Sequence, residues 1–248
     1  MGYSRASLIR RFLRCMEEAR LKNAEELKTY IISDKKNFDW LLQTITVNVT
    51  EMFRDPQFYK AIREKVLERL ASYPSIKIWH AGCASGEEVF SMAILLHEAG
   101  LLQRTRIYAT DINPANIEKA KTGIIPLTLM KEYTTNYLQS GGKGDFSDYY
   151  TARYKGALIS PELRTNIVFA QHNLVTDAAF NEFQLIFCRN VMIYFDKQLQ
   201  DRVIKLFYES LAPLSYLALG IKESLLFTEI KNQFEVIDLK NKIFRKKK

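Results

Sequence analysis

The sequence has few of the residues that bind metals or form disulfides. Its 248 residues include 3 Cys and 3 His. Cys15, Cys83 and Cys188 lie far apart, are odd in number and form no C-x-x-C pair, which argues against a disulfide framework and against a zinc site. The histidines have no second histidine at metal-ligand spacing. We therefore predict no metal site and a reducing compartment, and we expect structural or surface roles for His80, His97 and His172.

Long apolar runs are absent as well. No stretch approaches the ~20 apolar residues of a membrane-spanning helix. Met1 is followed by arginines and not by the apolar core of a signal peptide. We therefore expect a cytoplasmic protein without membrane insertion. The content of 10 Gly, 6 Pro and 47% hydrophobic residues excludes collagen-like and low-complexity classes and indicates a folded globular chain.

Acidic residues are the minority among the charges. There are 36 Lys and Arg against 28 Asp and Glu, so the net charge is +8. Such an excess fits nucleic acid, a membrane surface, an acidic partner or only a basic tail. Part of it lies in residues 1–28, where the cations are Arg5, Arg10, Arg11, Arg14, Arg20, Lys22 and Lys28. The charged residues after Asp238 are all basic, and we expect this tail to be solvated and frayed.

Two kinds of pattern divide the chain. Residues 1–46 have apolar residues at helical spacing, such as Leu8, Phe12 and Met16, and predict a small all-α unit. Asp55-Pro56 is typical of a helix start, and the helix after it should reach about Tyr73. We expect Asp55 and Asp196 to cap helices.

From residue 76 the chain alternates between strands and helices. Strands are expected at 76–81, 106–110, 166–170, 183–188, 216–219, 234–239 and 243–244, and helices at 86–98, 113–122 and 196–211. This alternation predicts an α/β fold with a mostly parallel sheet. Residues 136–163 interrupt it with a Gly-rich turn and several tyrosines, and we interpret them as a small β insertion.

The most informative stretch is residues 79–88, WHAGCASGEE. Its small residues let the backbone turn tightly and approach a ligand at the carboxyl end of a strand. Asp111 ends the next strand, where nucleotide-binding βαβ units carry an acidic residue about 20 residues after the turn. Glu87 and Glu88 at the helix start disfavour a phosphate and favour a cation. The pattern therefore favours S-adenosylmethionine, a positively charged nucleoside without phosphate, and the alternative is a purely structural glycine turn.

Three blocks carry a resemblance to a known family. Residues 46–56 read TVNVTEMFRDP, residues 81–88 read AGCASGEE, and residues 187–196 read FCRNVMIYFD. They resemble the T-x-N-x-T-x-F-F-R-[DE]-P, A-G-C-S-T-G-E-E and F-C-R-N-V-M-I-Y-F-D signatures of the CheR family of chemoreceptor glutamate methyltransferases. The likeness runs from Tyr3 to about Leu226. It implies a small helical N-terminal domain (1–46) and a doubly wound, Rossmann-like methyltransferase domain (47–248) with a small β-subdomain inserted at 136–163.

The resemblance also implies a site. The residues that would bind S-adenosylmethionine, and its product S-adenosylhomocysteine, are Asn48, Thr50, Arg54, Ala81, Gly82, Glu88, Asp111, Asn173, Leu174, Arg189 and Asn190. Arg54 and Tyr194 would flank the transferred methyl group as catalytic residues. No general base is needed, because a glutamate with a pKa of about 4.3 is already anionic at neutral pH. Arg54 offers a fork of donors for a carboxylate, and Tyr194 can donate one hydrogen bond without carrying charge.

The implied partner is the cytoplasmic helical bundle of chemoreceptors. A monomeric enzyme would meet it through the basic N-terminal helix and the β-subdomain. Two alternatives are a methyltransferase of the same fold that serves another signalling protein, and a cofactor-sensing module without turnover. The intact site residues argue against the second. Nucleic-acid methylation is not favoured, because the chain has no Asn-Pro-Pro-Tyr-like motif and no recognised RNA-binding module.

Some segments depart from the family pattern. Residues 213–216 read PLSY where the family usually has Gly-Gly, and residues 220–224 read GIKES where G-H-S-E-S is typical. The sequence also begins close to the G-Y-x-R-x-S-L-x-R-R element, so the helix that commonly precedes it is missing. Either the receptor-facing domain is short or the chain is trimmed.

Overall fold

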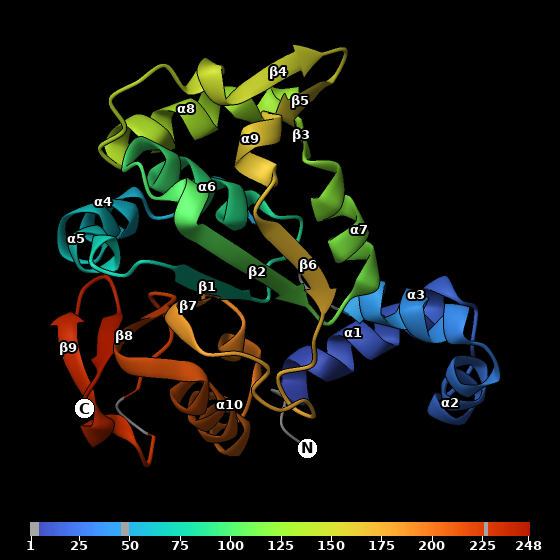
Figure 1. The fold of residues 1–248 in the computed structure, drawn as a ribbon. Helices are drawn as coiled ribbons and strands as arrows, with labels where there is room; N and C mark the ends of the chain where they lie inside the picture. Colours follow the sequence, from blue (N-terminus) through green and yellow to red (C-terminus); the bar gives the residue numbers. More distant parts are fainter. Residues whose placement is uncertain (1–4, 46–49, 226–227) are drawn as a thin grey trace.

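The structure, a computed structural model, describes residues 5–45, 50–225 and 228–248, and within them seven strands form the central sheet (Figure 1). The strands are β1 (Ile76–Ala81), β2 (Thr105–Asp111), β6 (Ile167–Gln171), β7 (Phe183–Cys188), β8 (Leu211–Leu219), β9 (Phe234–Asp238) and β10 (Ile243–Lys246). Their order is β6-β2-β1-β7-β8-β10-β9. The first five in this order run parallel, whereas β10 is antiparallel to both of its neighbours. This confirms the predicted α/β class with a mostly parallel sheet.

The sequence located most of these strands well, and β8 is the exception. β8 begins at Leu211, directly after α10 (Lys197–Ser210), and not at residue 216 as predicted. Its pairing with β7 shifts in register, so that Phe183 pairs with Leu211 but Leu185 pairs with Tyr216. Pro213 lies in this irregular stretch, where a residue without an N–H is tolerated.

Helices cover both faces of the sheet. On one face, residues of α4 (Pro56–Lys65), α5 (Leu67–Ala71), α6 (Glu87–Glu98) and α7 (Pro114–Thr122) share one large apolar cluster. On the other face, α10 packs against β1 and β7 through residues such as Trp79 and Phe207. The helix predicted to run from Pro56 to about Tyr73 is two helices, because Val66 between them departs from helical geometry with φ −118°.

Three helices form the N-terminal part of the described chain: α1 (Arg5–Glu18), α2 (Ala24–Ser33) and α3 (Lys35–Ile45). Cys15, Leu27 and Leu41 are the buried centre of their own small core. α3 also contacts α7. The arrowheads of β2 and β6 point toward α1 and α3 (Figure 1), so these helices lie at the carboxyl end of the large sheet.

A second, antiparallel sheet has the order β3-β5-β4. It consists of β3 (Ile124–Pro126), β4 (Tyr150–Arg153) and β5 (Gly156–Ile159), with α8 (Met130–Gln139) between β3 and β4 and the short α9 (Pro161–Arg164) after β5. The interval 136–163 therefore needs correction, because β3 precedes it and residues 136–139 are helical. Glu98 at the end of α6 ties this unit to the body, since its carboxylate accepts hydrogen bonds from the hydroxyls of Tyr137 and Tyr149.

The basic C-terminal tail is not frayed, contrary to the prediction. Residues of β10 pair with both β8 and β9. Lys246 Nζ donates to the carbonyl oxygens of Tyr208 and Leu211 at 2.8 and 2.7 Å, and so holds the tail against the end of α10. None of the helices over the three described ranges combines the length and apolar character that a membrane span requires.

Candidate active site

The strand order reverses between β1 and β7, which are neighbours in the sheet although β2 follows β1 in the chain. In open α/β sheets, ligands bind outside the carboxyl ends of the strands at such a switch point. We call the residues that follow β1, β2, β6 and β7 at this end the carboxyl edge. Most of the predicted site residues lie on it, and the structure therefore brings together four groups of residues that are far apart in the sequence.

The turn after β1 is tightly folded against its neighbours. The N–H groups of Gly82 and Cys83 both donate to the carbonyl oxygen of Thr110, at 2.8 and 2.9 Å. Gly82 has φ +82°, and a Cβ at this position would lie 2.4 Å from Val191 Cγ2. Only glycine therefore fits here, because it allows the turn to contact the loop that follows β7.

Asp111, at the end of β2, holds this turn in place. Its Oδ2 accepts the N–H of Ala84 at 2.9 Å, and its Oδ1 accepts the N–H of Asn113 at 2.8 Å and the side-chain amide of Asn116 at 3.2 Å. Burial raises the pKa of the Asp111 carboxyl, and the hydrogen bonds from Asn113 and Ala84 oppose that rise. These donors occupy most of the acceptor sites of the Asp111 carboxylate, and the residue is 7% exposed.

Arg189, which follows β7, is the centre of a buried ion-pair network. Its side chain is 1% exposed, and it donates to Glu88 Oε2 at 3.0 Å and to Asp55 Oδ2 at 2.7 Å. It also donates to the carbonyl oxygen of Arg54 at 3.2 Å and lies 4.0 Å from the ring centroid of Phe58. Asp55 occupies the N-cap position of α4, as predicted, but its side chain makes no cap hydrogen bond and binds Arg189 instead. The network joins the linker before α4 to the carboxyl edge.

His80 extends this network into the sheet. Its ring is fully buried, stacks on Phe187 at 4.4 Å and places Nδ1 3.0 Å from Glu88 Oε1. Burial favours a higher pKa for Glu88, but the hydrogen bond to His80 and the charge of Arg189 outweigh it and hold that pKa below its ordinary value. From the sequence we expected only a structural or surface role for His80. Its alternation with Trp79 along β1 is the signal that it faces α6.

Glu223 is the functional candidate that the sequence reasoning missed. Its carboxylate is buried and accepts N–H groups from the loop after β7, at Asn190, Val191 and Met192. The same loop contains Tyr194, whose side chain is half-buried. The signal in the sequence was the glutamate of the GIKES block, residues 220–224, which we had considered only as part of a departure from the family's G-H-S-E-S pattern.

An arginine of the N-terminal part reaches Tyr194. The guanidinium carbon of Arg11 lies 5.5 Å from the centroid of the Tyr194 ring, and Arg11 Nη1 donates to the carbonyl oxygen of Ile45. A cation within about 6 Å of an aromatic ring is attracted to it. The basic helix α1 therefore borders the predicted catalytic tyrosine.

The remaining predicted residues are placed less directly. Asn48 lies outside the described residues, and Thr50 is half-buried in the segment before α4. Asn173 forms a turn after β6, with Oδ1 accepting the N–H of Val175 at 2.9 Å, and Leu174 packs against the apolar cluster on the α10 side. Asp196 caps α10 as predicted, since its carboxylate accepts the N–H of Leu199 at 3.0 Å.

Comparison with known proteins decides the family. Residues 48–243 match the model of the family described as CheR methyltransferase, SAM binding domain. The chain belongs to the CheR methyltransferase family. The chain is 49% identical to Cher3 of Pseudomonas putida, and the alignment covers 99% of this chain and 90% of that protein. The name of that protein marks its methyltransferase activity as assumed. Two proteins named chemotaxis protein methyltransferase also match: one from Listeria monocytogenes (29% identity, 90% of this chain, 83% of the relative) and one from Salmonella typhimurium (28%, 94% and 80%).

The cofactor of this CheR-family methyltransferase is S-adenosylmethionine, and the carboxyl edge fits it. Arg189 at this edge is already paired with two carboxylates, so the edge suits a positively charged nucleoside better than a phosphate. Asp111 supplies negative charge beside the turn that Gly82 keeps narrow. When bound, the cofactor supplies an electrophilic methyl group on a sulfonium.

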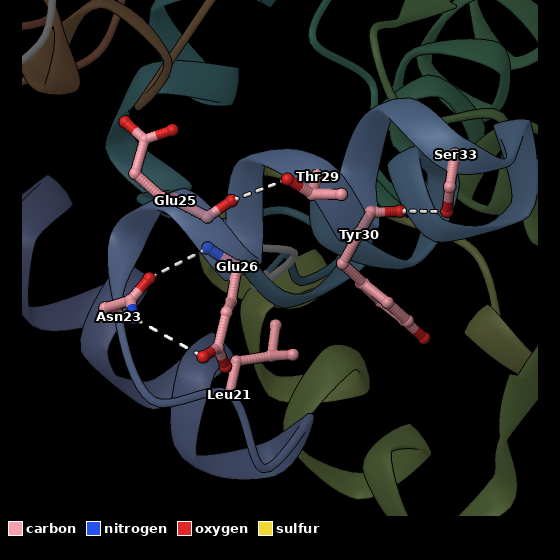
Figure 2. Close-up of a pocket in the computed structure, with 7 residues that line it drawn as sticks. All are labelled: Leu21, Asn23, Glu25, Glu26, Thr29, Tyr30 and Ser33. Carbon is pink, nitrogen blue, oxygen red and sulfur yellow. Dashed lines mark hydrogen bonds between the residues drawn. The ribbon is translucent and has the colours of Figure 1, made fainter.

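A pocket also lies on the N-terminal helices (Figure 2), with a volume of about 590 Å³. It is lined by Leu21, Asn23, Glu25, Glu26, Thr29, Tyr30 and Ser33. Asn23 caps α2, with Oδ1 accepting the N–H of Glu26 at 2.9 Å, and the Glu26 carboxylate accepts the N–H of Lys22 at 2.8 Å. These are the contacts of a helix cap, and none of the seven lining residues is a predicted site residue.

Proposed function

We propose that this CheR-family enzyme methylates glutamate side chains of bacterial chemoreceptors. Two relatives with 28–29% identity are named chemotaxis protein methyltransferase. The observation that carries the proposal is the contact of Arg11 with Tyr194, because it puts a cation and a phenol together beside the carboxyl edge. Such a pair suits an anionic acceptor such as a carboxylate.

The reaction is a direct displacement. A carboxylate oxygen of the acceptor forms a bond to the methyl carbon, the bond from that carbon to sulfur breaks, and its electron pair stays on sulfur, giving a methyl ester and S-adenosylhomocysteine. The acceptor is anionic at neutral pH and needs no base. The chain's contribution is therefore to bind and orient the acceptor.

We assign roles to the predicted residues on this basis. Arg54 and Tyr194 orient the acceptor carboxylate at the methyl group. Asn48, Thr50, Arg54, Ala81, Gly82, Asp111, Asn173, Leu174 and Asn190 contact the cofactor. Glu88 and Arg189 act on it mainly through the ion-pair network that they form with each other.

The partner is the helical cytoplasmic part of a chemoreceptor, and we propose that a monomer in the cytoplasm meets it. Arg10 and Arg14 on α1 are exposed on the helix that also presents Arg11 to Tyr194. A glutamate-bearing bundle would be attracted to these cations before one of its carboxylates reaches the site. The small sheet is a second surface that could meet the receptor.

The test is a transfer assay with receptor cytoplasmic fragments and methyl-labelled cofactor. We expect label on the fragment that mild base releases as methanol, because a glutamate methyl ester is base-labile. Label that survives base would contradict the ester. If no native receptor fragment were labelled while calorimetry still showed cofactor binding, another signalling protein would be the acceptor or the protein would be a cofactor-sensing module.

A further inference from the structure

The carboxylate of Glu223 holds four main-chain N–H groups at once. Oε2 accepts from Gly220 at 2.6 Å and from Asn190 at 3.1 Å, and Oε1 accepts from Val191 at 2.9 Å and from Met192 at 2.8 Å. The residue is 5% exposed. Its negative charge is therefore met by backbone dipoles that point at it from two loops, the one after β7 and the one after β8.

The loop after β7 needs such an acceptor. Asn190 has φ +62°, a left-handed conformation that is uncommon for a residue other than glycine. Successive N–H groups around a residue in this conformation point to a common centre and form an anion-binding nest. The short 3-10 helix from Met192 to Tyr194 follows at once. The Glu223 carboxylate fills the nest and thereby fixes the backbone that carries Asn190 and Tyr194.

Gly220 belongs to the same arrangement. A Cβ at this position would lie 2.7 Å from Glu223 Oε2 and 2.8 Å from the backbone nitrogen of Asn190. Both distances are far below ordinary van der Waals contact, so a side chain here would push the carboxylate away from the loop. Substitutions at Glu223 and at Gly220 are thus two ways to displace the same loop.

We infer that Glu223 is a positioning residue for methyl transfer, which acts by fixing the loop of Asn190 and Tyr194. This inference rests on the roles proposed above for those two residues. Glu223 itself is enclosed by the N–H groups that it accepts. Its effect on the reaction is therefore indirect, through the placement of the Tyr194 hydroxyl and the Asn190 amide.

Glu223→Gln tests the inference because it keeps the shape but replaces one acceptor oxygen with an amide that faces N–H donors. We expect kcat per correctly folded molecule to fall at least tenfold, with a smaller change in acceptor KM. Glu223→Asp keeps the charge but shortens the side chain and should fall between the wild type and Glu223→Gln. Gly220→Ala should lower kcat in the same way, although the carboxylate is intact.

Asp238→Asn is the matched control. Asp238 also accepts a main-chain N–H, that of Asn241 at 2.9 Å, and pairs with Lys65, but it lies in the β9–β10 hairpin. This variant should lower the melting temperature and leave kcat within twofold of the wild type. If Glu223→Gln behaved in the same way, with lower thermal stability and unchanged kcat, Glu223 would be only structural and the inference would be wrong.

Hydrogen exchange makes the test independent of the acceptor. Amides 190–192 should exchange faster in Glu223→Gln than in the wild type or in Asp238→Asn, and S-adenosylhomocysteine should bind more weakly by calorimetry. If the wild type labelled no receptor fragment, the proposed function would fail, and these two measurements would still decide the inference. Unchanged exchange at 190–192 together with unchanged affinity would overturn it.

Discussion

The carboxyl edge has two halves, the β1–β2 side and the β7–β8 side, and in each half a carboxylate holds the backbone that follows the neighbouring strand. On one side, Asp111 at the end of β2 reaches across to hold the turn after the neighbouring strand β1. On the other side, Glu223 beyond the end of β8 reaches across to hold the loop after the neighbouring strand β7. In each half the carboxylate comes from the strand farther from the switch point, and the backbone that it holds follows the strand nearer to it. The two carboxylates thus hold the edge from both sides of the switch point between β1 and β7.

The halves differ in the donors that their carboxylates accept. Asp111 accepts two main-chain N–H groups and one side-chain amide, and it is predicted to face the cofactor as well. Glu223 is occupied by four main-chain N–H groups. We therefore expect substitutions on the β1–β2 side to affect mainly cofactor binding, and substitutions on the β7–β8 side to affect mainly turnover.

The largest effect is expected where the halves are joined, at Arg189. Arg189→Met removes the cation that pairs with Glu88 and Asp55 and leaves two carboxylates without it. Breaking a buried ion pair in this way costs about 3 kcal/mol or more of unfolding free energy, and cofactor binding should be lost with it. Urea denaturation measures the first effect and calorimetry the second. Lys205→Met, which removes the exposed pair with Glu229, should change stability far less, because solvent screens an exposed ion pair. An equal loss in both variants would contradict the network.

The comparison of the halves is sharpest between Asp111→Asn and Glu223→Gln. Asp111→Asn leaves one acceptor oxygen where there were two, and an unpaired buried donor costs about 1–3 kcal/mol. We expect the affinity for S-adenosylhomocysteine to fall roughly tenfold or more, with a smaller fall in kcat at saturating cofactor. Glu223→Gln should show the opposite ratio. If both variants changed affinity and kcat in the same proportion, the division between the halves would not hold.

Next in size are the residues proposed to orient the acceptor. Loss of a hydrogen bond to a charged group costs about 1.5–3 kcal/mol, which is roughly a 10- to 100-fold change in rate. Tyr194→Phe and Arg54→Ala should each lower kcat by about this factor while calorimetry shows a smaller change in cofactor affinity. Cofactor binding lost together with normal residual turnover at saturating cofactor would show that the assigned roles are wrong.

The smallest effect is expected at the exposed cations of α1. Reversing Arg10 and Arg14 to Glu should raise the acceptor KM several-fold at low salt and spare cofactor binding. The effect should shrink at high ionic strength, because exposed charges are screened beyond about 10 Å at 0.1 M salt. The same double reversal at Lys247 and Lys248, which are exposed at the other basic end, is the control. Equal losses from the two pairs would mean that net charge matters and the helix does not.

Local sequence patterns were sufficient to locate the strands and helices whose ends carry strong signals. The apolar runs of β1 and β7 and the Asn113-Pro114 start of α7 were located to the residue. β3 escaped detection because it has only 3 residues and depends on pairing with β5, far along the chain. We expected the tail to fray because we considered only its charge. Its pairing with β8, which places it in the sheet, could not be seen from the local sequence.

The site was predictable as a set of motifs but not as a set of contacts. From the sequence we predicted Arg189 and Glu88 as separate site residues and Asp55 as a helix cap. The pair that Asp55 forms with Arg189 joins residues 134 positions apart, and no local rule reports such a contact. The role of Glu223 is hidden for the same reason, since three of its four main-chain partners lie about 30 residues earlier.

The contact of Arg11 with Tyr194 has a consequence for how such an enzyme can change its partner. Helix α1 contacts the loop of Tyr194 through the half-buried Arg11 and carries Arg10 and Arg14 on its exposed face, whereas the backbone of the loop is held by Glu223. Sequence changes on that exposed face leave the support of the loop intact. The surface that we propose to select the acceptor could therefore change in sequence without disturbing the edge that we propose to hold the cofactor.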